Sequence, residues 1–397
     1  MKNLAIVGII IVLILIPSKV AFMKEDHITD ISEEIRKIAE DQLDYLNIDK
    51  WDEFANGLNK NGDYLSSNVS IREMIINIVS GNFQFNWNQV FQTIGATLFD
   101  EITLNLSFMV KIFAIAIITG ILNNFKSNFS NASVGELAWM ICYIMIVVLI
   151  IQSISLALNI GKNAIEQMIS FMQILFPALL ALLIGMGGIA SSGIMQPATV
   201  LLSGITGVFL KSVMIPLIYL STILVLVGNI NDNINLKSLS KLTKNICNWI
   251  LGIVFTVFIG VLSMQGILAA SFDGISIRTT KYAIENFVPV VGKMFSQTVD
   301  ILVSCSLMLK NAVGVVGLIV AIGLCLYPTL KILSLMFAYK ICGALLEPIS
   351  DKRIVTCLNE IGSILLIFFI TIAGIAIMFF LTIALFIGIG NMTIMMR

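Results

Sequence analysis

Long apolar stretches separated by short polar loops dominate the chain from about residue 104 onward. The first two stretches lie at about 106–123 and 137–158, and a bilayer crossing needs roughly 20 apolar residues in a helix. Residues 104–160 are therefore predicted to form two transmembrane helices. With 58% hydrophobic and only 12% charged residues in the whole chain, the composition supports the same class.

The remainder of the membrane region contains an internal repeat, with one copy at 164–270 and a second at 283–389. Ala164-Ile165-Glu166 matches Ala283-Ile284-Glu285, and Leu210-Lys211 matches Leu330-Lys331 in the same order. Each copy holds a borderline apolar segment, a long one and a final one. Repeats of this kind are typical of membrane proteins built from related halves.

The long segment of each copy, at about 195–229 and 312–347, exceeds one straight crossing, because a helix of ~35 residues is about 50 Å long. Both segments are predicted to be broken or strongly bent. If the borderline segments 166–187 and 286–309 are re-entrant or interfacial, about six spans result; if they cross, each long segment forms a transmembrane hairpin. The predicted interruptions are at Lys211, Pro216, Pro328 and Lys331.

A small acidic domain is predicted to precede the membrane region, over residues 22–103. Residues 1–21 combine Lys2 with a following apolar run, as in a signal peptide or an N-terminal anchor. Within the domain, Ser70 and Glu73 form a capping-box pattern that predicts the start of a helix. Gly81 can end that helix in the left-handed conformation.

Charge predicts how the chain is oriented in the membrane. The loops at 231–245 and 348–358 are the basic ones, and the positive-inside rule places both in the cytoplasm. Residues 22–103 are then extracytoplasmic. The expected fold is an all-α polytopic membrane protein of about six transmembrane helices with an internal repeat and broken or re-entrant helices, plus a small helical extracytoplasmic N-terminal domain.

The residues that enzymes and cofactor sites need are scarce. The one histidine, His27, precedes the membrane region, and no HExxH or Gly-Lys-Ser/Thr motif occurs. The six cysteines form no Cys-x-x-Cys pair and suit small core positions. We therefore expect no enzyme activity, no cofactor and no metal. The acidic domain would repel phosphates, so we expect membrane lipid and protein partners and no nucleic acid.

Polar residues lie along one face of the helix predicted at the start of the second copy, and we call these residues the polar stripe. Unpaired ionic groups in lipid are costly, so the stripe predicts either the lining of an aqueous path or a helix contact or membrane interface. The matching positions of the first copy, Ile174, Ala178, Ala181 and Gly185, are mostly small. The stripe consists of Lys293, Gln297, Asp300, Ser304 and Asn311.

The stretch from Met264 to Gly317 resembles the stage III sporulation protein AE family. The shared elements are Gln-Gly, Asp-Gly-Ile, Arg-Thr, Asn-Phe-x-Pro-Val-x-Gly and Leu-Lys-Asn. The resemblance implies a multi-pass protein of the mother-cell membrane around the forespore. There it would be a subunit of a channel or secretion-like complex required for endospore development, working with the other subunits of that complex.

Two other functions remain open from the sequence: an autonomous secondary transporter, and a non-conducting membrane scaffold. The repeat and the predicted broken helices favour the transporter, and the acidic domain favours the scaffold. A homo-oligomer is compatible with each of these functions.

Overall fold

The computed structural model describes residues 43, 51, 70–81, 87–125, 132–199, 204, 206–230, 236–287 and 291–395, and in these ranges the chain is helical with no strand. Six of the helices are long and apolar enough to cross a membrane, which confirms the predicted all-α polytopic class. The segment 1–21 and most of the predicted acidic domain lie outside the described residues. The helices are α4 (Ile71–Val79), α5 (Trp87–Phe125), α6 (Ala132–Gly185), α7 (Ile189–Thr199), α8 (Gly207–Gly228), α9 (Lys237–Phe287), α10 (Val291–Leu346) and α11 (Lys352–Met395).

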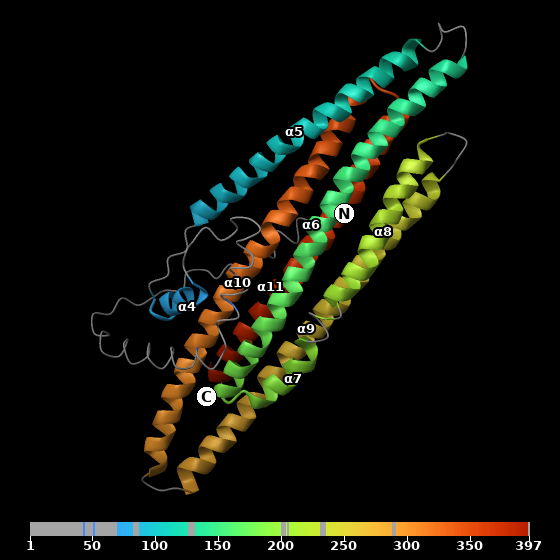
Figure 1. The fold of residues 1–397 in the computed structure, drawn as a ribbon. Coiled ribbons are helices and arrows are strands. Elements are labelled where there is room, and N and C mark those ends of the chain that lie inside the picture. Colours follow the sequence, from blue (N-terminus) through green and yellow to red (C-terminus); the bar gives the residue numbers. More distant parts are fainter. Residues whose placement is uncertain are drawn as a thin grey trace.

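The long helices form an elongated bundle of consecutive antiparallel hairpins, α5–α6, α8–α9 and α10–α11 (Figure 1). The helix ends that these hairpins join lie toward the same end of the bundle. Ser350 donates to the carbonyl of Ala116 in α5 at 3.1 Å, and Lys244 near the start of α9 lies 3.9 Å from Glu360 near the start of α11. We call this end the loop end.

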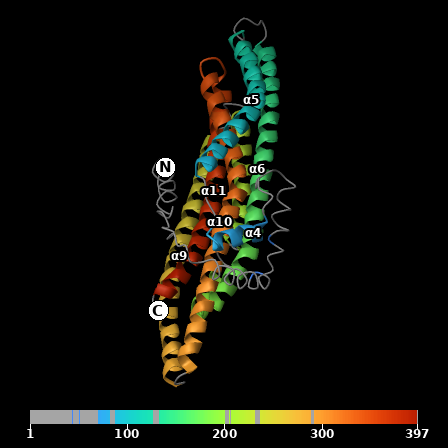
Figure 2. The same cartoon turned by 90° about the vertical axis from the view of Figure 1, so that its left-hand side faces the viewer.

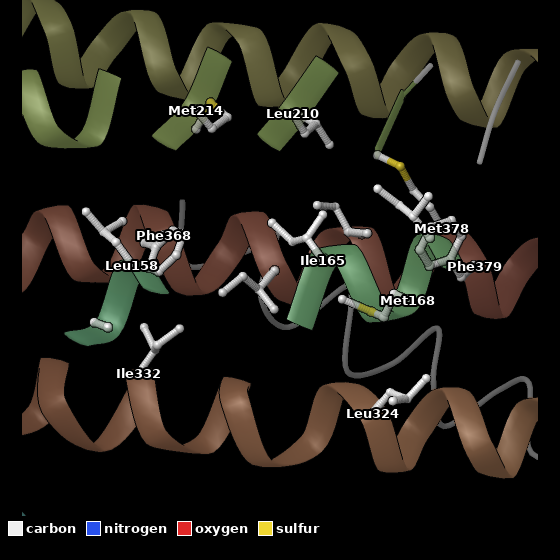
Figure 3. Packing of buried hydrophobic residues seen from close by; sticks show 14 of the residues in the cluster. Leu158, Ile165, Met168, Leu210, Met214, Leu324, Ile332, Phe368, Met378 and Phe379 are labelled. Atoms are coloured by element: carbon white, nitrogen blue, oxygen red, sulfur yellow. The ribbon is translucent and has the colours of Figure 1, made fainter. Parts of the chain in front are cut away.

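The bundle core is apolar and is built around α11. Figure 3 shows Leu158 and Ile165 of α6, Leu210 of α8 and Ile332 of α10 around Phe368 and its neighbours on α11. Helices approach closely where glycine faces an aromatic ring: a Cβ on Gly161 would overlap Phe368. Small residues commonly allow such close contacts between membrane helices.

Ser70 is the N-cap of α4, at the helix start that the capping-box pattern predicted. The Ser70 hydroxyl accepts a hydrogen bond from the Glu73 amide at 3.1 Å, and Gly81 has φ 73° just after the helix. The apolar side chains Ile71 and Ile75 are buried, and α4 packs against α10. The local sequence therefore predicted this helix correctly.

The borderline segments are not separate re-entrant helices. Residues 166–185 are the last part of α6, and residues 291–309 are the first part of α10. Each is continuous with a neighbouring apolar stretch in one helix of more than 50 residues. Because these segments extend existing helices and add none, the described residues contain six candidate membrane-spanning helices.

The predicted break positions lie inside continuous helices. Lys211 and Pro216 lie inside α8, and Pro328 and Lys331 lie inside α10. In the described part of the first copy, a break lies instead at 186–188, between α6 and α7, where Gly187 has φ 85°. Proline removes one backbone hydrogen bond, but neighbouring helices and local adjustment make it tolerable inside a membrane helix.

The two copies correspond only in part. In the first, α6 and α8 run antiparallel: Tyr143 bonds to Leu226, and further along α6 Glu166 pairs with Lys211. In the second, the equivalent segments are collinear within α10. Equivalence therefore fails for the borderline segments, whereas the hairpins α8–α9 and α10–α11 retain the same order of long helix, turn and long helix.

Candidate functional site: polar contacts of α10

Polar side chains of α10 extend into the apolar bundle at several levels. Lys310, Lys331 and Lys340 all belong to a helix segment apolar enough to span a membrane. An ammonium group in such surroundings requires a partner or water. We therefore describe what each of the three lysines contacts.

Lys310 is fully buried, with 0% of its surface exposed. Its Nζ donates to the main-chain carbonyls of Phe386 at 3.1 Å and Ile387 at 3.2 Å in α11. A helical carbonyl has a second lone pair that can accept such a bond. Next to it, the Asn311 amide donates to Asn391 Oδ1 at 3.0 Å. The Leu-Lys-Asn element thus attaches α10 to the last turns of α11.

Lys331 joins α10 to α5. Its Nζ lies 3.4 Å from Glu101 Oε1 and 2.9 Å from the hydroxyl of Tyr327. One turn further along, Asn105 of α5 donates to the Ser334 hydroxyl at 2.9 Å. The Glu101 side chain is 6% exposed and that of Lys331 is 25% exposed, so this ion pair is largely shielded from solvent.

Lys340 joins α10 to α11 near the loop end. Its Nζ donates to the carbonyl of Asn359 and to the hydroxyl of Ser363, both at 2.8 Å. On the preceding residue, Tyr339 is buried and its hydroxyl bonds to Ser153 of α6. Three neighbouring helices are thus tied to α10 by hydrogen-bonded side chains.

The two lysines predicted as break positions have another role. Lys211 pairs with Glu166 of α6 at 2.8 Å, as Lys331 pairs with Glu101 of α5. The aligned lysines of the two copies each form an ion pair with a glutamate on another helix. Both lysines lie inside continuous helices, and a strong bend at these positions stays a prediction.

The predicted stripe lies along α10, but its members do not share one environment. Asn311 contacts Asn391 of α11, so it is a helix contact, and Ser304 is exposed on the bundle surface. The side chains of Lys293, Gln297 and Asp300 lie outside the described residues. A path along these three residues stays a prediction.

The sequence pattern does not identify three of the polar residues that join α10 to its neighbouring helices. Lys310 enters the sequence pattern only as part of the Leu-Lys-Asn element, and no pattern marks Glu101 or Lys340. The available signal was a charged residue inside an apolar stretch, which marks a functional or structural contact by default. Among the described residues no group of three or more His, Cys, Asp or Glu could hold a metal.

The sequence profile described as stage III sporulation protein AE matches residues 69–390. This range includes all six long apolar helices. The chain belongs to the stage III sporulation protein AE family. It is similar to stage III sporulation protein AE of Bacillus subtilis (strain 168), with 33% identity over 374 residues that cover 94% of this chain and 92% of the relative. No solved structure matches.

The family match and the six long apolar helices together identify a multi-pass membrane protein of a sporulation family. The family match also includes Lys310, Glu101, Lys331 and Lys340. The helix contacts of α10 therefore lie in the part of the chain that characterises the family.

Proposed function

We propose that this protein is a membrane subunit of a channel or secretion-like complex that links mother cell and forespore during endospore development. The supporting observation is that Lys310, Lys331 and Lys340 are each already bonded to a neighbouring helix. These three ammonium groups are therefore engaged by contacts within the bundle. The interior of this subunit's bundle is therefore closed. The conduit of the complex forms instead between this subunit and the other subunits.

An autonomous secondary transporter is the second candidate. Such proteins commonly bind substrate near the bilayer midplane, at discontinuous helices. The break at 186–188 between α6 and α7 favours this function. Against it, α10 and α11 run without a break through the described part of the bundle, and the apolar core surrounds α11.

A flux measurement distinguishes these functions. The full-length protein is reconstituted in liposomes alone and together with the other subunits of the complex. The proposal expects flux only with the partner subunits. Flux through the protein alone would support the transporter and overturn the proposal, and no flux in either preparation would support a non-conducting scaffold.

The proposed location is the mother-cell membrane around the forespore, with the loop end in the cytoplasm and residues 22–103 outside it. The lysines at the start of α9 and the pair Lys352 and Arg353 at the start of α11 lie together at the loop end. Basic residues at one end of a bundle support a cytoplasmic position for that end.

A further inference from the structure

An open groove lies on the outer surface of α9, near the start of this helix at the loop end. Its volume is about 500 Å³, and its lining residues run from Ser238 to Ile253, about 22 Å along the helix. The polar lining residues are Ser238, Lys241 and Asn245, and all the others are apolar. The groove therefore has a polar part toward the helix start and an apolar part beyond it.

The apolar part of the groove faces away from the bundle. α9 lies along one side of the bundle, next to α8 and α11 (Figure 2). Only 22% of the most apolar part of α9 is buried in the bundle, compared with 56% for α11. Trp249 is 72% exposed, more than any other large apolar side chain of the described residues, and Ile253 is 58% exposed. This surface must therefore be covered by lipid or by another protein.

The residues that follow the groove fit the hydrocarbon core of a bilayer. After Lys244, the next charged residue of α9 is Asp273. The roughly 20 residues that follow Trp249 span about 30 Å, the thickness of that core. Within them, the exposed hydroxyls of Thr256 and Ser263 donate to carbonyls of their own helix, both at 2.8 Å. Trp249 thus lies at the edge of the hydrocarbon, where tryptophan is common.

The polar part of the groove lies at the level of the lipid headgroups. Asn245 and Lys241 are about 6 and 12 Å from Trp249 along the helix axis, toward the loop end. Lys241 is exposed and forms no ion pair with a carboxylate of the described residues. In contrast, Lys244 lies 3.9 Å from Glu360 of α11. The charge of Lys241 is therefore available to a ligand outside the bundle.

We propose that this groove binds an anionic phospholipid. The headgroup phosphate lies at Lys241, with Ser238 and Asn245 as hydrogen-bond donors, and an acyl chain lies against Trp249 and Ile253. An apolar helix in the same place would leave the ammonium group of Lys241 without a partner, which is costly. The site requires only that the chain spans a membrane, so it is independent of the proposed channel function.

The net charge of the headgroup determines which phospholipid the groove prefers. Phosphatidylcholine carries its own cation beside the phosphate and is neutral overall. Phosphatidylglycerol has a net negative charge, which a lysine close to the membrane surface attracts. The groove should therefore prefer phosphatidylglycerol, and this preference should depend on Lys241.

Fluorescence quenching by brominated lipids tests the proposal. The full-length protein is reconstituted alone in phosphatidylcholine liposomes that contain increasing fractions of phosphatidylglycerol with brominated acyl chains, because bromine quenches tryptophan on contact. The chain has four tryptophans, so the signal of Trp249 is the difference from the variant Trp249→Phe. The same titration with brominated phosphatidylcholine gives the relative affinity of the two lipids.

Phosphatidylglycerol should bind at Trp249 about fivefold more tightly than phosphatidylcholine, the effect of about one lysine beside a headgroup. Lys241→Gln should bring this ratio close to unity, whereas Lys241→Arg should retain it. The matched control is Lys162→Gln, which removes another exposed lysine, on α6, and should leave the ratio unchanged. Equal helix content of the variants shows that they fold.

Equal affinities of the two lipids for the unmodified protein would overturn the proposal. A preference that persists in Lys241→Gln, or one that Lys162→Gln also abolishes, would overturn it as well. In a preparation that includes the other subunits, loss of quenching by both lipids would show that a protein helix covers the groove and that the lipid assignment is wrong.

Discussion

The ion pair between Glu101 and Lys331 allows a quantitative test of how α5 is held. Lys331→Met removes the cation and leaves a carboxylate whose side chain is only 6% exposed. Removing one partner of a fully buried pair costs about 3–5 kcal/mol. Because Lys331 is 25% exposed, and solvent screens such pairs, we expect about 1–3 kcal/mol of destabilisation.

The second variant, Glu101→Gln combined with Lys331→Met, removes both charges. It should recover the stability to within about 1 kcal/mol of the unmodified protein, since no buried charge is then left alone. The assay is reversible unfolding of the purified protein in mixed micelles by increasing detergent denaturant, with helix content as the readout. The coupling between the two positions is obtained from the double-mutant cycle.

The aligned pair provides the control. Glu166 is 44% exposed and Lys211 27% exposed in their side chains, so Lys211→Met should cost less than about 1 kcal/mol. If Lys331→Met were no more destabilising than Lys211→Met, the burial argument would be refuted. Additive effects of the Glu101 and Lys331 changes would show that the two side chains do not interact.

Three further predictions follow from the contacts and the charge distribution. Lys310→Met should change the unfolding free energy by less than about 1 kcal/mol in the same assay, because the two hydrogen bonds of Lys310 and the cost of burying its ammonium group offset each other. A loss of stability above about 3 kcal/mol would contradict this balance. Gly161→Ala should destabilise by about 1–3 kcal/mol through overlap with an aromatic ring, and wild-type stability would contradict the close approach. Single cysteines at Lys241 and Lys352 should be protected from an impermeant maleimide in intact cells while one at Lys60 reacts; the reverse pattern would contradict the orientation.

The sequence predicted the features that depend on composition and local pattern. Apolar length predicted the six long helices, and the Ser70 to Glu73 spacing predicted the start of α4. These signals are local because a bilayer crossing and a helix cap each involve one segment of chain.

Helix continuity and pairing were harder to predict, because they depend on contacts between distant segments. The sequence pattern predicts breaks or strong bends at Pro216 and Pro328, whereas both prolines lie inside continuous helices, α8 and α10. The partner of Lys331 is Glu101, which lies 230 positions away in the sequence. No single-sequence pattern specifies such a pair, so the function of the aligned lysines emerged only from the structure.

The measurement that tests the central claim most directly is an experimental structure of the assembled complex in a membrane. The account predicts that the contacts of Lys310, Lys331 and Lys340 persist in it, and that any continuous pore lies at a boundary between subunits. A water-filled path through the bundle of this single subunit, with α10 and α11 separated, would contradict it.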